Sequence, residues 1–439
     1  MTLPSGSLRA DPGFRRFRAA RVVSTAGTLI TAVVLPVLVY RLTGSPAWTA
    51  AVVVAEALPH LLLGPVAAGI AARCRYGVLL CAADLAGAAL LSSIPLAWWH
   101  GSMSPWQVLG VASAMQAVFL LRQAAQAVAL PALVGMGSTA AGSAALRAAT
   151  GLVELMVPPL AGLAVAIVAP APLLTLDAVS FLASALLVRA AMHSRSTRPA
   201  AAASGAPVVA RRRVRAGLRF LRATPPSGTL ALAGTLHAAA GAGYLAVLLP
   251  WIDQQLGVPP SGDARLALLV SCWGLGALAG CAASPALTRQ LGPVRLARTG
   301  MSCSLAGGLG VLLCTHWLPA VLAGLLWGAV YTVVAKAAMD ALGQPARPAA
   351  KLLWHGVGPA VGAALAGALA QWSTPRAGLA VGVALLAAAA LAVRRGTAPV
   401  PPGSVPAQTA PNRHRRAGRT TETAPRAGTA TSFPGPRWR

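Results

Sequence analysis

Residues 22–73 read VVSTAGTLITAVVLPVLVYRLTGSPAWTAAVVVAEALPHLLLGPVAAGIAAR, and they hold two long apolar runs, 22–40 and 47–70, separated by a short polar stretch. A helix that crosses a membrane needs about 20 mostly apolar residues, and both runs come close to or exceed that length. Lipid offers no water to the backbone, so a crossing segment must be helical. This stretch therefore predicts two transmembrane helices joined by a short loop.

The same pattern fills the rest of the chain. Apolar residues make up 56% and charged residues 10% of its 439 residues, whereas about a quarter of the residues of soluble domains are charged. Ten more apolar runs lie at 78–97, 106–130, 146–168, 171–190, 229–250, 266–287, 295–315, 318–342, 351–371 and 377–394. The composition excludes a soluble protein and predicts an all-α integral membrane protein, with twelve transmembrane helices in two pseudo-symmetric six-helix bundles.

A long polar interval divides the apolar runs into two sets of six. The expected parts are a cytoplasmic N-terminus (1–21), an N-terminal bundle (22–190), a basic cytoplasmic linker (191–228), a C-terminal bundle (229–394) and a disordered basic cytoplasmic tail (395–439). The linker is rich in Ala, Ser, Pro and Arg, which predicts a mostly irregular segment. Within it, RRRVRAGLRFLR (211–222) can form an amphipathic helix on the inner leaflet with Leu218 and Leu221 toward lipid, or serve as a solvated topology anchor.

The net charge of +27 could indicate a nucleic-acid partner, but its distribution favours a membrane partner instead. If the N-terminus is cytoplasmic, 33 of the 36 Lys and Arg residues fall on the cytoplasmic side, leaving only Arg41, Arg265 and Arg376 outside. Positive residues concentrate in cytoplasmic loops of membrane proteins. We therefore expect a multi-pass protein of the cell membrane with both termini cytoplasmic, which contacts membrane lipid and no nucleic acid.

Several chemical activities lack their motifs. The two lysines, Lys336 and Lys351, do not follow glycine, so the sequence has no Walker A loop for ATP hydrolysis. The six cysteines include no C-x-x-C pair, and no H-E-x-x-H sequence is present. We expect no enzyme activity, no cofactor and no metal site.

The order of several segments along the chain resembles the major facilitator superfamily, in particular an actinobacterial branch related to drug and siderophore exporters. The segments are 35–73, LLCAADLAGAAL (79–90), LRQAAQAVALPALV (121–134), LDAVSFLASALLV (176–188) and GLRFLR (217–222). The resemblance implies alternating access between two bundles. It also implies gating motifs, whose matching residues are Gly64, Gly69, Arg73, Pro158, Gly162, Gly280, Arg289, Gly358 and Pro359.

The chain departs from this family's pattern where acids are usual. Ala72 precedes Arg73, where the family has an Asp-Arg pair, and Thr28 follows Gly27, where the family often has Gly-Asp. The fifth helix has Val157 and two prolines at the family's Gly-Pro motif. These losses leave an uncoupled or inward-moving facilitator open as an alternative to a proton-driven exporter.

Five of the nine acids lie inside apolar runs, where an ionisable group is costly and often functional. We expect Asp84 and Asp177 to have structural roles, such as pairing with a nearby Arg, and Asp340 to pair with Lys336 four residues earlier. Glu56 and Glu154 lie near the middle of their helices. Both are candidates for proton coupling, Glu56 together with His60 one turn later, and the alternative is a neutral Glu that only bonds between helices.

In this superfamily the first helix of each three-helix repeat lines the cavity. Polar and aromatic residues on those helices, spaced to share a face, are candidates for substrate contact. They are Thr28, Thr31, Gln116, Arg122, Gln123, His237, Tyr244, Trp327 and Tyr331. Such a set suits a mid-sized amphipathic solute, although the same residue types also bond helices to one another.

The sequence thus predicts a monomeric secondary transporter that exports an amphipathic small molecule, such as a drug, secondary metabolite or siderophore, by proton antiport. Its expected partners are that small-molecule substrate, protons and lipid. A degenerate membrane protein that senses or assembles without transporting is a further alternative, and an intramembrane enzyme is a distant one.

Overall fold

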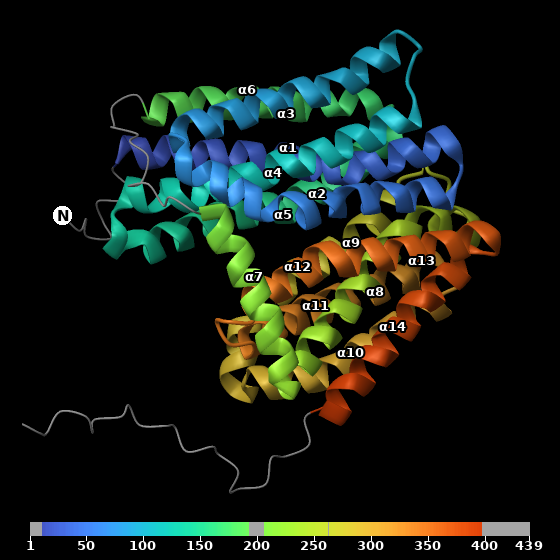
Figure 1. The fold of residues 1–439 in the computed structure, drawn as a ribbon. Helices are drawn as coiled ribbons and strands as arrows, with labels where there is room; N and C mark the ends of the chain where they lie inside the picture. The colour runs from blue at the N-terminus through green and yellow to red at the C-terminus, as the bar shows by residue number, and fades with distance from the viewer. Residues whose placement is uncertain (1–10, 193–205, 262, 397–439) are drawn as a thin grey trace, which may run out of the picture. The chain divides into compact units, whose positions relative to one another are not determined.

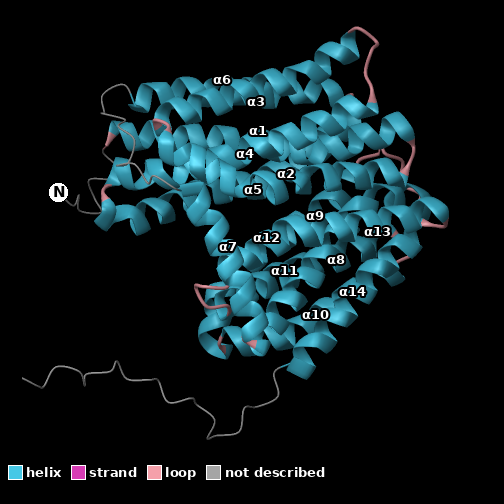
Figure 2. Ribbon diagram, viewed as in Figure 1, coloured by secondary structure: helices cyan, strands magenta, loops and turns pink. Residues whose placement is uncertain are grey.

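The computed structural model describes residues 11–192, 206–261 and 263–396, and every element in these residues is helical (Figure 2). Within these described residues, twelve helices are long and apolar enough to cross a membrane. The first six are α1 (Pro12–Thr43), α2 (Pro46–Arg73), α3 (Tyr76–Trp99), α4 (Pro105–Val134), α5 (Thr139–Ile167) and α6 (Pro170–Met192), with the short η1 (Met136–Ser138) before α5. The other six are α8 (Pro225–Leu256), α9 (Arg265–Leu291), α10 (Pro293–Leu313), α11 (Trp317–Ala341), a composite of α12 (Arg347–Leu352), η2 (Leu353–Val357) and α13 (Gly358–Trp372), and α14 (Pro375–Gly396).

Local sequence explains where the helices begin and end. Pro12, Pro46 and Pro105 stand in the first turn of their helices, where proline costs no hydrogen bond. Asp11 caps α1 by accepting a hydrogen bond of 2.8 Å from the Gly13 N–H. Gly44 ends α1 with φ of 62°, a left-handed conformation that glycine adopts without strain. The helix count predicted from the apolar runs is confirmed.

The start of α1 differs from the prediction. The apolar run begins at residue 22, but the helix begins at Pro12. Arginines interrupt the apolar pattern there, yet Phe14 and Phe17 are buried against Tyr76 and Leu80 of α3. The extra helical turns are therefore stabilised by packing at the end of the bundle, which a hydropathy window does not detect.

The helices form two bundles, one before and one after residues 193–205 (Figure 1). In the N-terminal bundle α6 packs on α1 and α3, and α4 packs on α2 and α3; in the C-terminal bundle α8 packs on α13 and α14, and α9 on α11. Small residues permit the closest crossings: a Cβ at Gly362 of α13 would overlap the backbone of Ala239 in α8. The bundles meet mainly through α2 with α13 and α5 with α9.

The linker is more ordered than the sequence predicts. Residues 206–223 form a continuous helix, α7 (Ala206–Ala223), and α8 begins at Pro225, so the expectation of a mostly irregular linker is wrong for this part. The expected lipid-facing leucines are also wrong. Leu221 is buried and Leu218 is partly buried in one apolar cluster with Leu342 and Ala349. The apolar face of α7 therefore packs on the C-terminal bundle. An amphipathic sequence pattern predicts an apolar face, but it does not show whether protein or lipid covers that face. Most of the expected irregular tail, from residue 397 on, lies outside the described residues.

Candidate functional site

Two ends of the membrane-crossing helices can be distinguished by charge. At one end, termed the basic end, lie Arg73, Arg189, Arg289 and the helix α7; the other is termed the opposite end and includes Arg41 and the α8–α9 connection. Several hydrogen bonds join the two bundles at the opposite end. Tyr40 donates to Asp253 at 2.7 Å, Ser45 donates to Gln371 at 2.7 Å, and Thr49 donates to the Ala246 carbonyl at 2.7 Å. The bundles are therefore closed on each other at the opposite end.

A cavity of about 1870 Å³ lies between the bundles on the other side of these contacts. Its wall contains residues of α2, α4, α7, α8, α9, α10, α11, α12, η2 and α13. The lining reaches the exposed side chains of Arg213, Arg215 and Lys351 at the basic end. The volume exceeds the range of about 300–1,000 Å³ that is usual for small-molecule pockets, so it can admit a solute with several rings.

Polar groups from both bundles meet in this cavity. Glu56 and His60 of α2 and Gln116 and Gln123 of α4 belong to the lining, as does His237 of α8. The His237 ring stacks on Tyr331 with 4.1 Å between ring centroids, and its Nε2 lies 3.0 Å from Ser304 Oγ. The sequence predicted Gln116, Gln123, His237 and Tyr331 as cavity residues. It predicted Glu56 and His60 as proton-coupling candidates, and the structure places both groups in one lining. Their roles in transport remain predictions.

Two predicted cavity residues lie behind the wall. Tyr244 and Trp327 are buried and do not line the cavity. The lining residue is Trp273 of α9, whose ring contacts both of them, at 4.9 Å from Tyr244 and 4.7 Å from Trp327. Trp273 was not predicted, because the family resemblance places cavity residues on the first helix of each three-helix repeat, and α9 is a second helix. A tryptophan near the middle of an apolar run was the available signal.

A second missed residue is His355, in the π-helical segment η2. Its ring lies 6.0 Å from that of His60, so an imidazole from each bundle faces the other within the cavity. The adjacent Trp354 donates from its Nε1 to the Ala231 carbonyl at 2.9 Å, which fixes this segment against α8. Single-turn π segments occur often at functional sites. The resemblance to known transporters fades in this part of the sequence, and no spacing rule pointed to His355.

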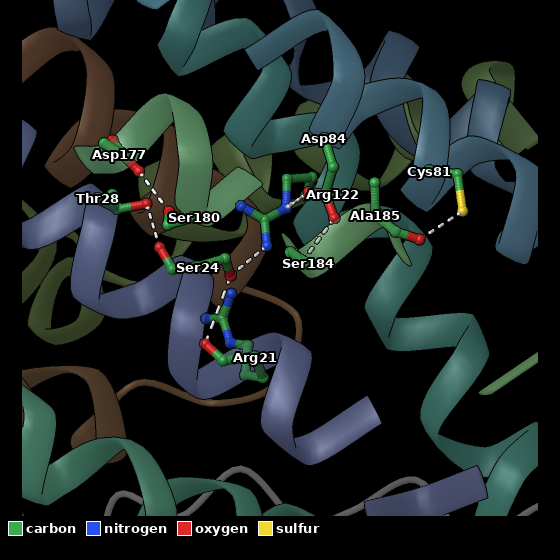
Figure 3. Close-up of polar contacts among 10 residues, drawn as sticks. All are labelled: Arg21, Ser24, Thr28, Cys81, Asp84, Arg122, Asp177, Ser180, Ser184 and Ala185. Atoms are coloured by element: carbon green, nitrogen blue, oxygen red, sulfur yellow. Dashed lines mark hydrogen bonds and ion pairs between the residues drawn. The ribbon is translucent and has the colours of Figure 1, made fainter. Parts of the chain in front are cut away.

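The buried charges of the N-terminal bundle form a separate network (Figure 3). Arg122 Nε lies 2.9 Å from Asp84 Oδ1, an ion pair whose N–H direction falls short of a hydrogen bond. Arg122 also donates to Ser24 Oγ at 2.5 Å, and Ser184 donates to Asp84 at 2.7 Å. The predicted pairing of Asp84 with an arginine is confirmed. The placement of Arg122 in the main cavity is wrong, because this ion pair holds it inside the bundle.

The first-helix candidates also lie away from the main cavity. Thr28 and Thr31 line a small neighbouring pocket of about 140 Å³ together with Arg122 and Asp177. Thr31 donates to Asp177 at 2.5 Å, and Thr28 donates to the Ser24 carbonyl at 2.8 Å. Glu56 and Gln116 line both spaces. The threonines therefore contribute bonds between and within helices, which the sequence had left as an alternative.

Two predicted acids have surroundings that the sequence did not predict. Glu154 lies near the middle of α5, as predicted, but its side chain is exposed and does not line either pocket. Asp340 lies 3.9 Å from Arg347, and Lys336 contacts the Cys281 carbonyl at 3.5 Å instead of Asp340. The Arg347 side chain comes from the next element along the chain and reaches Asp340 in a way that helical spacing cannot predict.

The predicted gating residues fall into three groups. Gly64 and Pro359 line the cavity, and Pro158 is partly buried on α5. Glycines at crossings allow close backbone approach: Gly162 faces Ala267, Gly280 faces Ala329 and Gly358 faces Thr235. Gly69 is buried, whereas Arg73 and Arg289 are exposed at the basic end. Gly162, Gly280 and Gly358 thus have a packing reason, and a gating role remains a prediction.

No protein-family model and no curated protein sequence matches this chain. Solved structures do match its fold. A nucleoside transporter, NupG (D323A mutant), superposes with a TM-score of 0.71 and 9% identity, over 88% of this chain and 100% of that one. A bacterial homologue of the lysosomal transporter Spinster, in an inward-facing and unoccupied conformation, gives 0.61 and 14%, over 88% and 93%.

A bacterial homologue of the iron transporter ferroportin, in an inward-facing state, gives a TM-score of 0.59 and 15% identity, over 87% of this chain and 98% of that one. Identities this low establish a shared fold and no shared substrate. All three are transporters of the major facilitator type. The chain is a multi-pass membrane protein with the fold of major facilitator superfamily transporters.

Proposed function

We propose that this protein is a secondary transporter that exports an amphipathic small molecule through the central cavity by alternating access. One observation carries the proposal: a cavity between the bundles reaches the basic end, while hydrogen bonds join the bundles at the opposite end. A carrier needs a closed end and an open end that can exchange. The aromatic rings of Trp273, Tyr331 and Phe119 beside a few polar groups suit a solute with an apolar body.

The basic end is assigned to the cytoplasm. Lys and Arg concentrate at that end, and cytoplasmic loops carry such an excess. With this orientation, the cavity is reached from the cytoplasm. An exporter collects its substrate in this state, and the direction of transport is proposed from the sequence.

Protons are the proposed driving ions, and Glu56 with His60 is the proposed exchange site. Glu56 is the one acid in the lining of the main cavity, within the described residues. It also borders the pocket that holds Asp177 and Arg122, so loss or gain of its proton alters the field of that charge network. Substrate and proton then compete for the same cavity state, as exchange requires. Glu154, being exposed, is the second candidate.

The proposal is tested by measuring whether the two ends open alternately. Nitroxide labels at Ser102 and Thr315, both exposed at the opposite end, report the separation of the bundles there. A second pair at Arg75 and Arg298 reports the basic end. We expect two populations in which one distance lengthens as the other shortens. A single population that no pH or ligand changes indicates a protein that does not transport, the degenerate alternative.

A further inference from the structure

The charged residues around the central cavity are unequal in sign. Among the described residues that line the cavity, one is acidic, Glu56, and four are Arg or Lys. These are Arg213 and Arg215 of α7 and Arg347 and Lys351 of α12. A cleft lined by charges of one sign concentrates solutes of the other sign. The cavity mouth is therefore suited to negative charge.

The basic residues of α7 are held in place by packing. Gly217 approaches α12 so closely that a Cβ there would lie 2.8 Å from the Pro345 carbonyl oxygen. Leu221 is buried four residues later against Leu342 and Ala346. Arg213 and Arg215 precede these contacts on the same continuous helix. They stand in the cavity wall as parts of a folded element.

Within the part of the chain that the structure describes, acidic side chains neutralise little of this charge. Arg347 lies 3.9 Å from Asp340, whose side chain is 57% exposed, so this pair is weak. Among the described residues, no acidic side chain forms an ion pair with Arg213, Arg215 or Lys351. All three are exposed and keep their attraction for an incoming anion.

Membrane topology alone does not explain their position. Topology requires basic residues at this end, and Arg73, Arg295 and Arg298 meet that need without lining the cavity. The basic residues of α7 and α12 come from two distant parts of the sequence and meet at the cavity mouth. Topology does not require this meeting.

We propose that the transported molecule is an organic anion: a carboxylate, sulfonate or phosphate attached to an apolar or aromatic body. The anionic group meets the four basic residues of the α7–α12 mouth, and the body lies deeper, beside Trp273 and Tyr331. This inference rests on the proposed transport function. An anionic lipid headgroup has the same chemistry at the mouth, so the test must separate the two sources.

The test compares three probes with one fluorophore and different charge: dansylglycine (anion), dansylglycinamide (neutral) and dansylcadaverine (cation). Their binding to the full chain is measured by fluorescence in nanodiscs of phosphatidylcholine. We expect dansylglycine to bind about tenfold more tightly than dansylglycinamide, as the sum of several partly screened charges. That preference should shrink as salt is raised.

The variant for this test is the triple substitution Arg213→Gln, Arg215→Gln and Lys351→Gln. It should bring dansylglycine affinity down to that of dansylglycinamide and leave dansylglycinamide affinity unchanged. The control is Arg295→Gln, Arg298→Gln and Arg395→Gln, three exposed basic residues that do not line the cavity. The control should keep the preference, and equal thermal unfolding temperatures of both variants exclude a folding defect.

Each remaining outcome decides a different point. If the cation binds best, or if all three probes bind equally, the anion inference is overturned and the transport proposal stands. If none of the three binds, the proposed function itself fails. Repeating the measurement in nanodiscs that contain phosphatidylglycerol separates lipid from solute: a mouth that serves lipid loses the dansylglycine preference there, and the inference is then overturned in favour of a headgroup site.

Discussion

The hydroxyl of Tyr40 donates a hydrogen bond of 2.7 Å to Asp253, and this bond joins α1 of the N-terminal bundle to α8 of the C-terminal bundle. Gln254 donates to the same hydroxyl at 3.4 Å. Arg41, the next residue along α1, donates to the Pro260 carbonyl beyond α8. In a carrier these bonds must break before the opposite end can open, so they bias the protein toward the state with an open basic end.

Removing this bond should shift the balance between the two states. A hydrogen bond to a charged acceptor contributes about 1.5–3 kcal/mol, and 1.4 kcal/mol is a tenfold change in a population ratio. We expect Tyr40→Phe or Asp253→Asn to raise the opposite-end-open population about tenfold or more, measured by spin-label distances between Ser102 and Thr315. Asp263→Asn is the control, because Asp263 accepts its hydrogen bonds from Arg265 of the same bundle and so does not join the two bundles. Those hydrogen bonds lower the pKa of Asp263. Equal shifts in the control and the variants would mean that the Tyr40–Asp253 hydrogen bond does not hold the opposite end closed.

Cysteine labelling distinguishes the cavity wall from the layer behind it. In a background without the six native cysteines, Gln116→Cys and Gln123→Cys should react with a membrane-impermeant maleimide applied at the basic end, because both residues line the cavity. Trp327→Cys should stay unlabelled, because that side chain is only 3% exposed. Leu186→Cys, on the exposed face of α6, is the lipid-facing control. Reaction of all four at one rate would mean that the cavity does not separate these positions.

Topology gives a prediction for orientation. A reporter that is active only in the cytoplasm should work when fused after Arg195 or Arg416, and should be inactive when inserted beside Asp263. The reason is the excess of Lys and Arg on the side that holds both fusion sites. The reverse pattern would turn the cavity mouth to the outside and remove the support for export.

Close helix packing gives a prediction for stability. A Cβ at Gly362 would overlap the backbone of Ala239, whereas nothing lies within 4 Å of a Cβ at Gly110. We expect Gly362→Ala to lower the thermal unfolding temperature, because α13 must move away from α8. Gly110→Ala should leave it unchanged or raise it, since alanine favours a helix by about 1 kcal/mol over glycine. The unfolding temperature is measured by size-exclusion chromatography after heating. An equal change in both variants would argue against the tight α8–α13 crossing.

The helix count and the division into two bundles could be predicted because the bilayer imposes them. Long apolar runs have one solution in lipid, and the interval after residue 190 is too polar to cross. The start of α1 at Pro12, ahead of the apolar run, could not be predicted from hydropathy. Contacts of Phe14 and Phe17 with α3 stabilise these extra helical turns. The burial of Leu221 could not be predicted either, because helical spacing does not distinguish a leucine that faces lipid from one that packs on protein.

The candidate site was predictable where helical spacing fixes a face. Glu56 and His60 are one turn apart, and Gln116 and Gln123 two turns apart, and all four line the cavity. Spacing fails for Trp327, because rotation of α11 within the bundle decides whether it reaches the cavity or packs behind Trp273. It also fails for His355, which approaches His60 only through the fold of the whole protein.

We propose that Glu56 couples a proton to substrate movement. The measurement is the efflux of a dansyl probe from loaded proteoliposomes, with and without an acid outer solution. One pH unit provides about 1.4 kcal/mol per proton, enough for about tenfold redistribution of the probe. Loss of gradient-driven efflux in Glu56→Gln, with exchange in the absence of a gradient retained, is the predicted result, because glutamine imitates the protonated acid. Glu154→Gln, measured in parallel, shows whether the exposed acid shares this role. Full gradient-driven efflux in both variants would mean that neither acid couples protons to transport, and would favour an uncoupled carrier.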